Sequence, residues 1–182
     1  MARDNADGEE RTRTVLCALD VGWARDQGEA RPDSADGPFF LGEVGQAALR
    51  AATEEAERRG ARLTLLHALP VEPGAPMSPG GVEQALVTRE RLTRTVADGL
   101  TRAAERLGSR AADEVTIVVE DGPADEAIVR TAERLAAELV VLGDAGAHRP
   151  RPRRLGSVAA SVARNARCSV LVVREPALAG AG

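Results

Sequence analysis

Three glycines and a serine near the carboxyl end of the sequence form a pattern that suits phosphate binding. Gly143 and Gly146 are separated by two residues, and Gly156-Ser157 follows after nine more. Glycine lets the backbone turn tightly and approach a ligand closely, because no Cβ intervenes. Gly156-Ser157 opens a predicted helix over 157–166, whose first amides and positive dipole end favour an anion. The pattern therefore predicts a phosphate site, in which a side chain at position 156 would occupy phosphate space.

Four arginines lie between the second and third glycines and could offset the charge of a phosphate. These candidates are Arg149, Arg151, Arg153 and Arg154. All 24 basic residues are arginines, which excludes Schiff-base chemistry, a phosphate-loop lysine and the lysine of a receiver domain. The plainer alternative is that the glycines are ordinary turn residues between a strand and a helix.

Apolar runs and amphipathic stretches alternate along the chain and predict a β-α-β-α-β-α-β-α-β order. The expected strands are 14–19, 63–69, 115–119, 139–142 and 169–173, and the expected helices are 44–59, 82–107, 124–137 and 157–166. Because the strands are apolar without alternation, we expect an α/β fold with a parallel sheet covered on both faces. Ligands of such sheets bind beyond the carboxyl ends of the strands, where the winding reverses. The residues at those ends are Asp20, Ala68, Gly122 and Gly143.

The bulk composition indicates one soluble globular domain. A chain of 182 residues with 43% hydrophobic and 29% charged residues can bury a single core. The net charge of -4 provides no general attraction for nucleic acid or anionic membranes. No apolar run approaches the roughly 18 residues that a membrane span needs. We expect a disordered tail at 1–13, one domain at 14–175, a tail at 176–182 and a cytoplasmic location.

Together with the glycine pattern, several segments resemble the universal stress protein family. That family's nucleotide motif is Gly, two residues, Gly, nine residues and Gly-Ser/Thr, which this sequence matches. The segments 139–143 and 168–174 are similar to its last two strands, and residues 122–129 are similar to the start of its third helix. The resemblance covers about residues 14–175.

The resemblance implies a Rossmann-like, adenine-nucleotide α-hydrolase-like sheet of five parallel strands in the order 3-2-1-4-5, with helices on both faces. It implies an ATP-binding stress-response or signalling module with little or no catalytic activity, ATP being bound with or without Mg²⁺. It also implies a homodimer through the last strand, residues 169–173. In this pattern Asp20 and Ala68 contact adenine or ribose, Leu142 and Gly143 line the pocket, and Gly146, Gly156, Ser157 and Val158 hold ribose and phosphates.

Two other functions stay open. One is a regulatory interaction domain that binds no nucleotide, against which the intact glycine set argues. The other is slow ATP hydrolysis or nucleotidyl transfer, although Asp20-Val21-Gly22 stands where such enzymes carry a Ser-Gly-Gly type of loop. The spacing shows neither a nucleophile–base pair nor a metal-ligand set, so we assign no catalytic and no metal-binding residue. Asp20 could still bind Mg²⁺ or a ligand hydroxyl.

A long insertion, residues 21–43, should leave the first strand on the ligand side of the sheet. It contains the only aromatic residues, Trp23, Phe39 and Phe40. We expect them to pack the first helix and the sheet edge, and a lid over the nucleotide base is the alternative.

The histidine and cysteine positions indicate structural roles. His67 lies in an expected strand and is interpreted as structural. Cys17 and Cys168 belong to the first and fifth strands, which the implied order separates by one strand. Their Cα atoms should then be about 10 Å apart, which is too far for a disulfide.

Overall fold

The computed structural model describes residues 13–23, 39–70, 79–107, 115–144 and 155–174. In chain order the elements are β1 (Thr14–Ala18), β2 (Gly22–Trp23), β3 (Phe39–Phe40), α1 (Glu43–Arg59), β4 (Arg62–Leu69), α2 (Pro79–Glu105), β5 (Thr116–Asp121), α4 (Ala124–Arg134), β6 (Leu139–Gly143), α5 (Ser157–Asn165) and β7 (Ser169–Val173). Every predicted strand and helix is present. Residues 1–12 and 175–182, which make up most of the predicted tails, lie outside the described residues.

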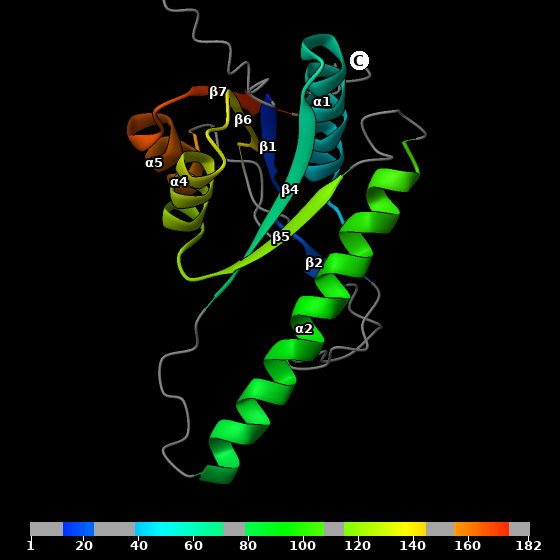
Figure 1. The fold of residues 1–182 in the computed structure, drawn as a ribbon, viewed down its shortest axis with the longest axis vertical. Coiled ribbons are helices and arrows are strands. Elements are labelled where there is room, and N and C mark those ends of the chain that lie inside the picture. The colour runs from blue at the N-terminus through cyan, green and yellow to red at the C-terminus, as the bar shows by residue number, and fades with distance from the viewer. Residues whose placement is uncertain (1–12, 24–38, 71–78, 108–114, 145–154, 175–182) are drawn as a thin grey trace, which may run out of the picture.

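Five strands form one parallel sheet in the order β5-β4-β1-β6-β7, which confirms the order 3-2-1-4-5. β1 is central, with Cys17 in register with Leu65 of β4 and Val141 of β6. The chain first adds β4 and β5 on one side of β1, and then β6 and β7 on the other (Figure 1). The winding therefore reverses between β1 and β6.

Each face of the sheet is buried under different helices, because successive strand residues point to opposite faces. Leu16 and Val140 belong to a cluster that includes Ile128 of α4 and Val162 of α5. The residues next to Leu16 and Val140 in the strands belong to a second cluster, which lies beneath α1 and α2. Figure 1 shows α4 and α5 on one side of the sheet and α1 on the other. This arrangement confirms the predicted three-layer α/β fold.

Small side chains and a glycine cap define α1. Ala48, Ala52 and Ala56 are buried, in agreement with their spacing of four residues. Gly60 ends the helix with φ 58°, in the left-handed region that favours glycine.

Two helix bounds differ from the prediction by three residues, and the other helix bounds agree within two. α2 begins at Pro79 instead of residue 82, because proline suits the first turn of a helix. α4 ends at Arg134 instead of residue 137, because Ala136 adopts φ 47°.

The insertion contains a short hairpin pairing that the sequence analysis missed. β2 and β3 pair antiparallel, with Gly22 opposite Phe40 and Trp23 opposite Phe39. Strands of two residues are too short to show a hydrophobic period. The predicted packing of the three aromatic side chains lies outside what the structure describes.

Both cysteines are free thiols, and only Cys17 lies in a strand, so the predicted placement of Cys168 within the last strand is wrong by one residue. Cys17 is fully buried in β1, and Cys168 directly precedes β7. β6 lies between these strands, as the predicted order required. Burial raises the pKa of both thiols, so neither is activated as a nucleophile.

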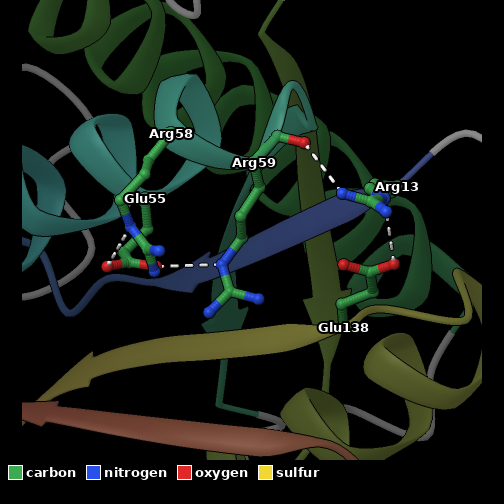
Figure 2. Close-up of polar contacts among 5 residues, drawn as sticks. All are labelled: Arg13, Glu55, Arg58, Arg59 and Glu138. Carbon is green, nitrogen blue, oxygen red and sulfur yellow. Dashed lines mark hydrogen bonds and ion pairs between the residues drawn. The ribbon is translucent and has the colours of Figure 1, made fainter.

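A hydrogen bond and an ion pair join three segments at the amino end of the sheet (Figure 2). Arg13 donates to the Arg59 carbonyl at 3.3 Å, and its Nε lies 3.6 Å from Glu138 Oε1. Within α1, the Glu55 carboxylate accepts hydrogen bonds from Arg58 and Arg59. Surface pairs of this kind contribute little to stability. A ligand of a parallel sheet is expected at the opposite, carboxyl edge.

Candidate functional site

Residues at the carboxyl ends of β1, β4 and β6 lie at the edge where the winding of the sheet reverses. Ala18 of β1 is in register with Leu66 of β4 and Leu142 of β6. Asp20, Ala68 and Asp144 each follow two residues after these three positions. Because neighbouring strands are about 4.8 Å apart, we expect these residues to form a row across the strand ends.

The first turn of α5 offers backbone amides to this edge. Its first internal hydrogen bond runs from the Ala160 amide to the Gly156 carbonyl at 2.9 Å. The amides of Ser157, Val158 and Ala159 therefore have no hydrogen-bond acceptor within the helix. The N-cap residue, Gly156, has no side chain that could cap this helix, and Ser157 and Val158 are exposed. The helix start thus suits an anion.

Gly156 is held against Asp144 by its backbone. The Gly156 amide donates to the Asp144 carbonyl oxygen at 3.0 Å. A Cβ at position 156 would lie 2.6 Å from that oxygen. The prediction that a side chain here would occupy phosphate space stays a prediction. The structure adds a second reason for glycine at this position, because a Cβ would collide with the Asp144 backbone.

The structure describes most of the predicted site residues. Leu142 is buried, Ala68 and Gly143 are partly buried, and Asp20 is exposed. Together with the α5 start, these residues lie at the ends of β1, β4 and β6. The predicted residues Gly146, Arg149, Arg151, Arg153 and Arg154 lie outside the described residues.

Asp144 is a residue of this edge that the sequence analysis missed. Its amide donates to the Val173 carbonyl at 3.0 Å, which extends the β6–β7 pairing. Its carboxylate lies 3.0 Å from Arg174 Nε, and the Asp144 side chain is only 12% exposed. The signal in the sequence that could have identified Asp144 is its position directly after the first motif glycine, where its negative charge would repel a bound anion.

His67 has a structural role at the same edge, as predicted. Its Nδ1 lies 2.9 Å from the Leu19 carbonyl oxygen, which joins β4 to the end of β1. Since a carbonyl only accepts, Nδ1 carries a proton and donates it to Leu19. Burial lowers the pKa of His67, while the Leu19 hydrogen bond and the Asp20 carboxylate oppose this shift.

We expect His67 to make stability depend on pH. A lowered folded-state pKa means that the unfolded chain binds more protons once the pH falls below the ordinary value of 6.5. The contribution of His67 is complete above that value and is lost as the pH falls towards the folded pKa. A His67→Asn variant, whose amide can still donate to Leu19, should show a shallower loss of the free energy of unfolding between about pH 7 and pH 5.

Urea unfolding across this range measures the effect, with His148→Asn as the matched variant at the only other histidine. A profile flattened by His148→Asn but not by His67→Asn would contradict the assignment.

Two further observations concern the described residues as a whole. Among the residues that the structure describes, no group of three or more His, Cys, Asp or Glu side chains could hold a metal ion. Within the same residues, no helix is long and apolar enough to cross a membrane.

Comparison with known proteins gives consistent matches. A family model described as "Universal stress protein family" matches residues 41–174. A universal stress protein of Methanocaldococcus jannaschii is 46% identical over 61 residues, which cover 34% of this chain and 35% of that protein. The matched segment thus spans only about a third of this curated relative.

Solved structures match over nearly the whole chain. UspA from Lactobacillus plantarum has a TM-score of 0.63 at 22% identity, covering 90% of this chain and 99% of that one. A universal stress protein in complex with cAMP has a TM-score of 0.56 at 19% identity, covering 90% and 98%. An Arabidopsis thaliana family member with AMP bound has a TM-score of 0.53 at 15% identity, covering 91% and 93%. At these identities the likeness demonstrates a shared fold.

Proposed function

Since the chain belongs to the universal stress protein family, we propose that it binds an adenine nucleotide, with ATP favoured, at the carboxyl edge between β1 and β6. The observation that carries this proposal is the uncapped first turn of α5, tied by Gly156 to the end of β6. It lies where the sheet reverses its winding, which is the general ligand position of this architecture.

The described residues fit a nucleotide phosphate. Three amides of the α5 first turn and the exposed Ser157 side chain supply donors, and the helix dipole adds positive potential. Leu142 and Gly143 would line the pocket, as the resemblance implied. Asp20 and Ala68, in the neighbouring row, would contact the base or ribose, and Asp20 could hold a Mg²⁺ that accompanies the phosphates. The arginines at 149–154 remain candidates for offsetting phosphate charge.

Adenine is favoured over other bases because two structural neighbours carry cAMP and AMP. We propose little or no catalysis, and a stress-response or signalling role in which nucleotide occupancy sets contacts with partners. A homodimer through β7 is part of the proposal, because β7 is an edge strand with Leu171 exposed.

Titration calorimetry with ATP, AMP, cAMP and GTP tests this function. We expect saturable binding of one ATP per chain and much weaker binding of GTP. At a ligand concentration of about 100 times Kd, ATP should stabilise the fold by about 2.7 kcal/mol, which thermal unfolding detects. Mass analysis of ligand released from freshly purified protein gives an independent identification.

The outcomes separate the parts of the proposal. Absence of both heat and thermal stabilisation with every nucleotide would reject nucleotide binding and favour the interaction-domain alternative. Tighter binding of AMP or cAMP than of ATP would keep the nucleotide class and reject ATP as the favoured ligand.

A further inference from the structure

The end of β6 carries a charge that the proposed ligand should avoid. Asp144 follows the first glycine of the motif. Its carbonyl oxygen accepts a hydrogen bond from the amide of Gly156, the last glycine of the motif. One residue therefore joins both ends of the segment that contains the glycine motif. Its carboxylate is largely buried, with 12% of the side chain exposed. A phosphate bound at the α5 start would lie near this negative charge.

Arg174 is the described side chain that compensates for this carboxylate. Its Nε lies 3.0 Å from Asp144 Oδ2, and it directly follows β7. The Asp144 amide also donates to the carbonyl of Val173, the residue before Arg174. Backbone and side chain of Asp144 are thus both fixed by the end of β7. Arg174 lies outside the glycine motif and follows a different strand from Asp144.

From these contacts we propose that Arg174 is a positioning residue for the nucleotide site. It neutralises the Asp144 carboxylate, and it holds Asp144 where the Asp144 carbonyl can fix Gly156 and the α5 amides. This inference rests on the proposed function for its ligand, whereas the tie between β6, β7 and α5 exists without one. Without Arg174, the largely buried Asp144 carboxylate would be unpaired and would repel phosphate. It would also favour movement of the Asp144 backbone.

A double-mutant cycle tests the role with Arg174→Gln, Asp144→Asn and the two combined. We expect Arg174→Gln to weaken ATP binding about tenfold, because an uncompensated charge then faces the phosphates. Asp144→Asn removes the need for a partner, so the double variant should bind ATP nearly as the wild type does. The loss should shrink from ATP to AMP and vanish with adenosine, which carries no phosphate.

A matched control comes from the other end of β7. Arg167 pairs through Nε with Glu133 at 3.2 Å but is 86% exposed. Arg167→Gln removes the same charge and a similar ion pair, and it should leave the affinity for ATP unchanged.

Amide hydrogen exchange of Gly156 in ligand-free protein is the second readout. Arg174→Gln should accelerate it, and adding Asp144→Asn should restore protection. If the wild type binds no nucleotide, the proposed function fails, while restored protection still supports the tie. An equal loss of ATP affinity from Arg174→Gln in both backgrounds, or unchanged affinity and exchange, would overturn the positioning role.

Discussion

A Gly156→Ala variant is expected to bind ATP about 100-fold more weakly than the wild type. The added Cβ would lie 2.6 Å from the Asp144 carbonyl oxygen, so the two segments must separate by several tenths of an ångström. This movement takes the α5 amides out of line with the phosphates. Losing two charge-assisted hydrogen bonds at about 1.5–3 kcal/mol each corresponds to at least that factor. The Gly156 backbone has φ -60° and ψ 154°, which alanine adopts freely, so the contact itself causes the loss.

Gly80→Ala is the matched control for this substitution. Gly80 lies in α2, where an added Cβ would meet no described atom within 4 Å apart from its chain neighbours and the nearby backbone of its own helix. Alanine there should stabilise the helix by up to about 1 kcal/mol. Calorimetry is performed at a temperature where both variants are folded by circular dichroism. Wild-type ATP affinity in folded Gly156→Ala protein would show that the α5 start does not hold the phosphates.

The fold could be predicted because its signals are local and repeated. Continuous apolar runs such as residues 139–142 are typical of strands buried on both faces. Alanines spaced by four residues gave the buried face of α1. The strand order could not be predicted from periodicity alone. It followed from the family resemblance, which rests on the spacing of Gly143, Gly146 and Gly156. That spacing is typical of a complete strand–loop–helix unit.

The contacts within the site could not be predicted, because they depend on segments that are distant in sequence. Asp144 and Gly156 meet across eleven intervening residues, and spacing alone does not tell which atom a missing Cβ would meet. The Asp144–Arg174 pair depends on the β6–β7 register, in which Gly143 lies opposite Val173. The sequence therefore located the edge at which we propose ligand binding, while the contacts of each residue at that edge required the structure.

Leu171→Glu is expected to weaken the proposed homodimer at least about 100-fold. β7 is an edge strand of the sheet, so one of its sides lacks a strand neighbour within the described chain. Two copies related by a twofold axis would pair β7 with β7 antiparallel and extend the sheet. Leu171 is the middle residue of β7 and would then face its own copy. Two uncompensated carboxylates at this position would cost on the order of 3 kcal/mol or more.

The monomer should tolerate the same change, because Leu171 is already 36% exposed and lies outside both core clusters. Leu86→Glu on α2, at a leucine that is 65% exposed, provides the same chemical change away from β7. Sedimentation equilibrium should then give a dimer for the wild type and for Leu86→Glu, and a monomer for Leu171→Glu. A dimer that is dissociated by Leu86→Glu instead would move the interface to α2, and a wild type that is monomeric at every concentration would reject the dimer. Because Arg174 directly follows β7, an interface on this strand would lie beside the residue proposed to hold Asp144, so nucleotide affinity should change with the degree of association.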